Sequence, residues 1–150
     1  ILNLRRDVKN TIYESPIGHT IDQLINVFKP ANLELAAPGF EGLGQDEVLT
    51  AELSLDIGRG LFAKTAIHPR QVDIIHSAYM VNSEDLEMAE AIVDPQSTAV
   101  FRLGNRMCEK AVHTSWALKV LERARIYGSY ELRREPYYDL TLEPDYNMIG

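Results

Sequence analysis

The feature that most constrains the fold is the junction at residues 63–75, AKTAIHPRQVDII, where an apolar run passes directly into an amphipathic helix. Proline disfavours helical geometry for the residue before it, so we expect His68 to end a strand, while Pro69 suits the first position of a helix. In a parallel α/β protein this kind of junction lies at the carboxyl edge of the sheet, where ligand sites gather. The junction therefore predicts both a fold class and the position of a site.

Helical and extended patterns alternate before this junction. Apolar residues recur at helical spacing over residues 21–28, with Thr20 as the expected N-cap, and again over residues 46–57. Two strand candidates, residues 32–41 (NLELAAPGFE) and 60–67 (GLFAKTAI), each follow one of these helices. The order helix, strand, helix, strand is typical of α/β folds with a parallel sheet.

The pattern becomes mainly helical after Pro69. We expect helices over residues 70–80, from Ser83 to residue 93, and over residues 109–127, with Val112 and Trp116 on the buried face of the last one. A stretch that is either irregular or hairpin-like, residues 94–107, separates the second helix from the third. The ends are less regular: residues 1–4 resemble the end of a strand, and residues 134–150 an arm that packs on a neighbour or a partly ordered end.

Composition narrows the class of protein. A chain of 150 residues, 45% hydrophobic and 25% charged, is long enough for one globular domain with a core. A net charge of -7 argues against sequence-independent binding to nucleic acid. Cys108 is the only cysteine, which excludes an intrachain disulfide and a cysteine-built zinc site. No stretch has the pattern of a membrane span or a signal peptide, so we expect a cytoplasmic protein.

Two groups of polar side chains are candidates for chemistry. Lys64 and His68 lie four residues apart on a predicted strand and so share one face, which in a barrel would be the interior or the mouth. The alternative is a solvated or paired lysine and a histidine that only caps the next helix. Residues 103–113, LGNRMCEKAVH, place Arg106 and Glu109 in a donor-rich turn before the long helix. The alternative there is a charged helix start, with Glu109 favoured by the helix dipole.

These stretches together resemble a known family. Residues 60–93, from GLFAKTAIHP to EMAEAIV, resemble the segment that marks the citrate lyase β-subunit and malyl-CoA lyase-like group of TIM-barrel carbon–carbon lyases. Residues 105–128, beginning NRMCEKAVH, resemble the C-terminal motif of that group. With residues 4–28, LRRDVKNTIYESPIGHTIDQLINVF, the chain is most similar to the bacterial C–C bond lyase branch associated with tellurium-resistance-type operons.

The resemblance implies a (β/α)₈ TIM barrel with a helical C-terminal extension. Because such a barrel takes about 250 residues, this chain would be the C-terminal part of one. Residues 1–80 would hold the last strands and helices of the barrel, and residues 81–150 the helical extension and tail. The two strand candidates would then be the seventh and eighth strands, with residues of the family pattern missing before Ile1 and near Gly42.

The resemblance also implies an activity and its residues. It implies a Mg²⁺-dependent carbon–carbon lyase acting on an acyl-CoA or related acyl ester, in a homo-oligomer that exchanges C-terminal extensions, with the metal ligands upstream of this chain. Lys64, His68, Pro69 and Arg106 would bind substrate, and Glu109, where the family often has aspartate, would be the catalytic acid. The rival is a non-catalytic barrel that binds a coenzyme or nucleotide and serves a bacterial stress or biosynthetic operon.

Overall fold

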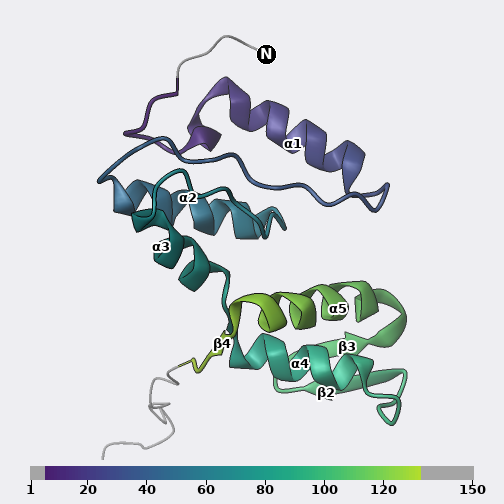
Figure 1. Cartoon of the computed structure of the whole chain (residues 1–150). Coiled ribbons are helices and arrows are strands. Elements are labelled where there is room, and N and C mark those ends of the chain that lie inside the picture. Colours follow the sequence, from purple (N-terminus) through teal and green to yellow (C-terminus); the bar gives the residue numbers. More distant parts are fainter. Residues whose placement is uncertain (1–5, 133–150) are drawn as a thin grey trace, which may run out of the picture.

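The computed structural model describes residues 6–132, so the strand end expected at residues 1–4 and the tail at 134–150 lie outside the described residues. Figure 1 shows an upper group of elements, α1, α2 and α3, above a lower group of α4, α5 and the short strands. The helices are a 3₁₀ turn (Ile12–Glu14), α1 (Pro16–Phe28), α2 (Asp46–Gly58), α3 (Arg70–Tyr79), α4 (Ser83–Val93) and α5 (Lys110–Tyr127). The strands are β1 (Val81–Asn82), β2 (Val100–Leu103), β3 (Arg106–Glu109) and β4 (Ser129–Tyr130).

The two predicted strands of the upper group do not form a ladder. Residues 32–41 and 60–67 are extended segments joined by one parallel bridge between Ala37 and Lys64, with the Ala37 amide 2.7 Å from the Ala63 carbonyl oxygen. Parallel strands are stable when further strands flank them and helices cover both faces. The described residues supply only this pair of segments, although α2 still crosses between them as in a β-α-β unit.

One helix start differs from the prediction, and one agrees with it. The first helix begins at Pro16 rather than after Thr20, because the Ser15 hydroxyl accepts a hydrogen bond from the Ile17 amide and Pro16 fits the first turn. α4 begins at Ser83 as predicted, and the side chain of the preceding residue, Asn82, caps it by accepting from the Asp85 amide at 2.7 Å.

The hairpin and the long helix of the lower group are confirmed. β2 and β3 pair antiparallel, and Gly104 takes the left-handed conformation, φ 56°, that the tight turn between them requires. α4 and α5 lie side by side against the hairpin (Figure 1), around a core of Val81, Ala89, Ile92, Cys108, Ala117 and Val120. Trp116 packs against this core as expected, whereas Val112 is 66% exposed.

The upper group has its own core, formed mainly by Phe40, Leu49, Leu53, Ile75 and Tyr79. Residues of α5 in the lower group contact this upper core. The Tyr127 hydroxyl at the end of α5 donates to the Phe62 carbonyl oxygen at 3.0 Å, and the Tyr127 ring lies against Tyr79 with the ring centroids 5.2 Å apart. Among the described residues, no helix is long and apolar enough to cross a membrane.

Candidate functional site

The strand-to-helix junction forms as a tight, hydrogen-bonded turn. Pro69 already has helical angles, φ −53° and ψ −35°, and α3 begins at the next residue. The His68 ring nitrogen Nδ1 accepts from the Arg70 amide at 3.2 Å, so His68 caps the start of α3. Because Nδ1 is an acceptor there, the proton of the neutral ring sits on Nε2, which is left as a donor.

The Gln71 side chain connects this junction to the first extended segment through hydrogen bonds. This role was not predicted from the sequence. The side chain is 3% exposed, and its Oε1 accepts from the Ile67 amide at 3.0 Å. Its Nε2 donates to the carbonyl oxygens of Phe40 and Gly42, at 2.9 and 3.2 Å. A glutamine in the first turn of a helix gives little signal of such a role, because two of its three backbone partners lie about 30 residues away in the sequence.

The Lys64 side chain is buried and paired, which is the alternative that the sequence left open. Its ammonium lies 2.7 Å from Glu52 Oε1 and 2.8 Å from Asp56 Oδ2, and all three side chains are 0% exposed. Lys64 therefore points toward α2, the crossover helix, whereas the other interpretation placed it at the interior or the mouth of a barrel. Ala63, Thr65 and Ile67, on the opposite face of the same segment, are exposed.

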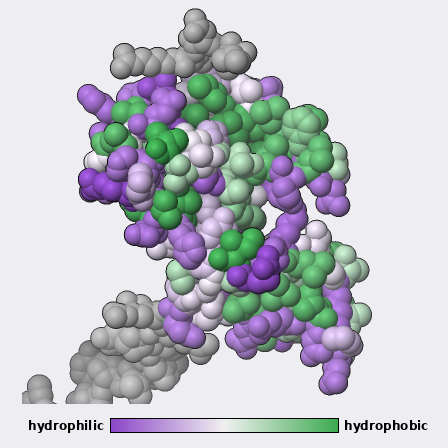
Figure 2. All heavy atoms as spheres, in the orientation of Figure 1, coloured by the Kyte–Doolittle hydropathy of each residue, from purple (hydrophilic) through white to green (hydrophobic). Residues whose placement is uncertain are grey.

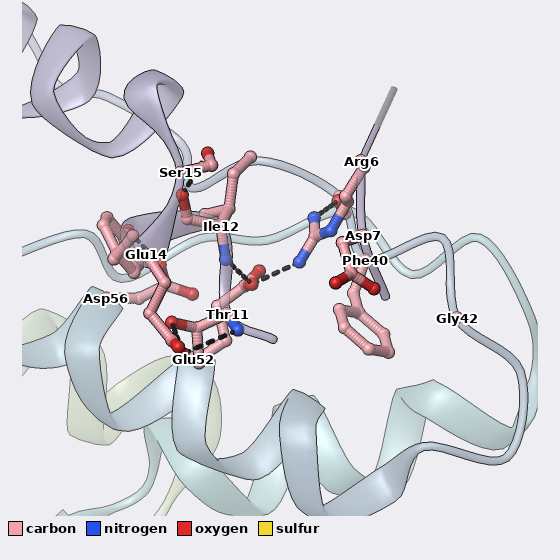
Figure 3. A network of polar contacts seen from close by, with 12 residues as sticks. Arg6, Asp7, Thr11, Ile12, Glu14, Ser15, Phe40, Gly42, Glu52 and Asp56 are labelled. Atoms are coloured by element: carbon pink, nitrogen blue, oxygen red, sulfur yellow. Dashed lines mark hydrogen bonds and ion pairs between the residues drawn. The ribbon is translucent and has the colours of Figure 1, made fainter. Parts of the chain in front are cut away.

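The carboxylates that hold Lys64 belong to a larger network that the N-terminal segment completes. Figure 3 shows Arg6 and the Ile12 amide converging on Glu52; the amide lies 2.8 Å from Glu52 Oε2, the oxygen that also pairs with Arg6. The Tyr13 hydroxyl donates to Asp56. Two cations and two carboxylates thus meet in a buried space between the N-terminal segment, α2 and the second extended segment.

Burial controls the protonation of this network. Burial raises the pKa of Asp56, while the hydrogen bonds from Lys64 and Tyr13 oppose that rise. Burial also raises the pKa of Tyr13, and the adjacent Asp56 carboxylate raises it further. Tyr13 therefore remains a neutral hydrogen-bond donor in the folded protein.

Glu52 and Asp56 were not among the predicted site residues, although the sequence carries a signal for them. Leu49 and Leu53 belong to the apolar spacing that predicts the helix over residues 46–57; Glu52 follows Leu49 by three residues, and Asp56 follows Leu53 by three. Positions 49, 52, 53 and 56 form a single helical stripe, so an inward-facing leucine pair implies inward-facing acids beside it. Acids on such a stripe require a buried cation, and Lys64 is the one that the next strand candidate offers.

The hairpin places Arg106 and Glu109 on opposite faces. Arg106 points to α4, with Nη1 3.1 Å from Asp85 Oδ1. Side chains alternate along β3, so Cys108 is buried like the inner residues, whereas Met107 and Glu109 face outward. The Glu109 carboxylate has no hydrogen-bond or ion-pair partner within residues 6–132. Likewise no hydrogen bond or ion pair of these residues joins Arg106 or Glu109 to the junction at His68.

Comparison with protein families decides the class. A family model for C-C bond lyases of the TIM-barrel fold matches residues 1–129. The chain belongs to this family. The match confirms a carbon–carbon lyase family and a TIM-barrel fold, and the mixed helices and short strands fit a part of such an α/β barrel. No curated protein matches the chain, so the comparison assigns the family and no individual relative.

The described residues of this C-C bond lyase family member do not form a metal site. Within residues 6–132, no three His, Cys, Asp or Glu side chains gather as metal ligands would. Glu52 and Asp56 do meet, but Arg6, Lys64 and Tyr13 occupy their oxygen atoms, which leaves little for a hard cation. The Mg²⁺ ligands expected upstream of this chain stay a prediction.

Proposed function

We propose that the protein is a Mg²⁺-dependent carbon–carbon lyase of the citrate lyase β-subunit-like type, which cleaves an acyl-CoA or a related acyl ester. The observation that carries this proposal is the family match over residues 1–129. Mg²⁺ is assigned no ligand in the described residues. Its chemistry in such a reaction would be to polarise the oxygen atoms of the acyl group.

Glu109 is the proposed catalytic acid. Cleavage of the carbon–carbon bond leaves a thioester enolate, whose α carbon must receive a proton, and a positioned carboxylic acid can supply it. Glu109 suits this role because it stands unpaired on the outer face of the hairpin, beside exposed Met107. Such an outward carboxylate can reach a substrate held by another subunit, in line with a homo-oligomer that exchanges its extensions.

The proposed substrate-binding residues differ in how directly they can act. His68 Nε2 has no hydrogen-bond partner within residues 6–132 and lies at the end of the second extended segment, and Pro69 fixes the turn that presents it. Arg106 uses one nitrogen on Asp85 and is 61% exposed, so its other nitrogens can bind a phosphate or carboxylate. Lys64 is fully engaged, so it acts by holding the segment that leads to His68 in place.

The direct test is an assay of carbon–carbon cleavage. The purified protein is incubated with malyl-CoA or citryl-CoA, and released acetyl-CoA is measured with Mg²⁺ and again with EDTA. We expect release that requires Mg²⁺. Binding of the coenzyme without any release would contradict the proposal and favour the rival, a barrel that binds a coenzyme or nucleotide without turnover.

A further inference from the structure

A cavity separates the two groups of elements on the side away from the hairpin. It measures about 630 Å³, which lies within the usual range of small-molecule sites, roughly 300–1,000 Å³. Its walls are the starts of the two extended segments, residues 34–36 and 62–63, and one face of α5. Figure 2 shows an opening between the upper and lower parts of the molecule, with hydrophobic surface on both sides of it.

The lining is apolar with one exceptional cation. Leu35, Phe62, Leu118 and Ile126 supply most of the apolar wall. Arg123 reaches across from α5 and stacks its guanidinium over the Phe62 ring, 4.6 Å from the centroid. Its Nε is buried without a hydrogen-bond partner in the described structure.

The other charges around Arg123 are already paired. Across the cavity, Lys119 lies 2.7 Å from Glu34, and Arg125 binds Glu122 through two hydrogen bonds of 2.8 and 2.9 Å. Burial lowers the pKa of Arg123, and the nearby Asp85 carboxylate opposes this change only in part. That carboxylate is itself paired with Arg106. Arg123 is thus the cation of this cavity that lacks a counter-ion among the described residues.

A partly buried guanidinium without a partner is costly, because it loses water without gaining an anion. The planar fork of arginine matches a carboxylate with two parallel hydrogen bonds. An anion that entered this cavity would place its charge on Arg123 and its remaining atoms against the apolar wall. Charge complementarity therefore defines the ligand.

We propose that this cavity binds a small carboxylate with an apolar body, held by Arg123 and by the wall of Leu35, Phe62, Leu118 and Ile126. The site is separate from the proposed lyase site. It opens at the amino-terminal ends of the extended segments, whereas His68 lies at the carboxyl end of the second one, and catalytic groups of TIM barrels sit at the carboxyl ends. The cavity is an accessory site for an anionic ligand.

The test is isothermal titration calorimetry of the protein with octanoate and with 1-octanol, which share the apolar body and differ in charge. We expect octanoate to bind more tightly than octanol. Arg123→Gln should weaken octanoate about tenfold or more and leave octanol unchanged, since it removes a charged hydrogen-bond partner. Arg102→Gln, on β2 and outside the cavity lining, should leave both affinities unchanged.

A second variant keeps the test informative if Arg123→Gln fails to fold. Ala36→Leu fills the cavity from an exposed position without changing charge, so it should weaken octanoate and octanol alike. Equal affinity of the wild type for octanoate and octanol would overturn the proposal. So would octanoate affinity that survives both Arg123→Gln and Ala36→Leu, or the absence of any octanoate binding.

Discussion

At the residue scale, the buried pairing of Lys64 with Glu52 and Asp56 is the most informative feature. The net contribution of a buried ion pair to stability is often small, because each charge gives up its hydration. Removing one partner is different, since the remaining charge stays buried and uncompensated. Lys64 therefore holds two carboxylates inside the protein as well as its own segment.

Lys64→Met should reveal this dependence. The substitution keeps the length of the side chain but leaves the Glu52 and Asp56 carboxylates without their shared cation. We expect a loss of about 3–5 kcal/mol in the free energy of unfolding, measured by urea denaturation. Lys119→Met removes a partly exposed partner of Glu34 and should cost only about 0–1 kcal/mol. Equal losses would mean that Lys64 is not buried with its acids.

Tyr13 should make stability sensitive to alkaline pH. Its pKa is raised in the folded protein, whereas the unfolded chain ionises it near the ordinary value of about 10. Its contribution is thus complete below about pH 10 and declines as the pH rises above that value, by about 1.4 kcal/mol per pH unit. Tyr13→Phe should remove this slope. A difference between wild type and Tyr13→Phe that stays constant from about pH 8 to about pH 11 would contradict it.

Residue-scale prediction succeeded where chemistry is local. The sequence offered a paired lysine and a capping histidine as one of two interpretations, and the structure has both. It did not offer Glu52 and Asp56 as partners, because an acid on a helix normally faces water. It also gave no sign that Arg6 and Tyr13 would complete the network, since they lie 46 and 43 residues from the acids they contact.

At the element scale, the hairpin shows how alternation assigns roles to neighbouring residues. Arg106 and Glu109 were expected to cluster, yet the pairing of β2 with β3 turns them to opposite faces. The helices were predictable because apolar spacing repeats over several turns. The missing ladder between the two extended segments of the upper group was not predictable, because a parallel ladder depends on neighbouring strands that lie outside each segment.

The register of β3 can be tested with adjacent substitutions. Cys108 is 1% exposed and belongs to the lower core, whereas Met107 is 69% exposed. Cys108→Ser buries a hydroxyl among apolar side chains and should cost about 1–3 kcal/mol of stability, lowering the melting temperature. Met107→Ser should have almost no effect. The reverse order would mean a shift of one residue in the pairing.

At the scale of the whole molecule, the second extended segment has one face covered and one face open. Lys64 and Ala66 face α2 and α3, while Ala63 and Thr65 are exposed and Ile67 is 51% exposed. The sequence predicted the family and the carboxyl-edge junction from local motifs. It did not predict the cavity beside α5, which forms only where two distant parts of the chain meet.

The most direct test of Glu109 as the catalytic acid is the rate of acyl-CoA cleavage by Glu109→Gln, compared with that of Glu90→Gln. Glutamine keeps the shape of the side chain but cannot donate a proton as a carboxylic acid does. We expect Glu109→Gln to lose about 10²–10⁴-fold in rate with an unchanged melting temperature. Glu90→Gln, an exposed acid on α4, should keep the wild-type rate. Wild-type turnover by Glu109→Gln would contradict the central claim that this carboxylate is the catalytic acid.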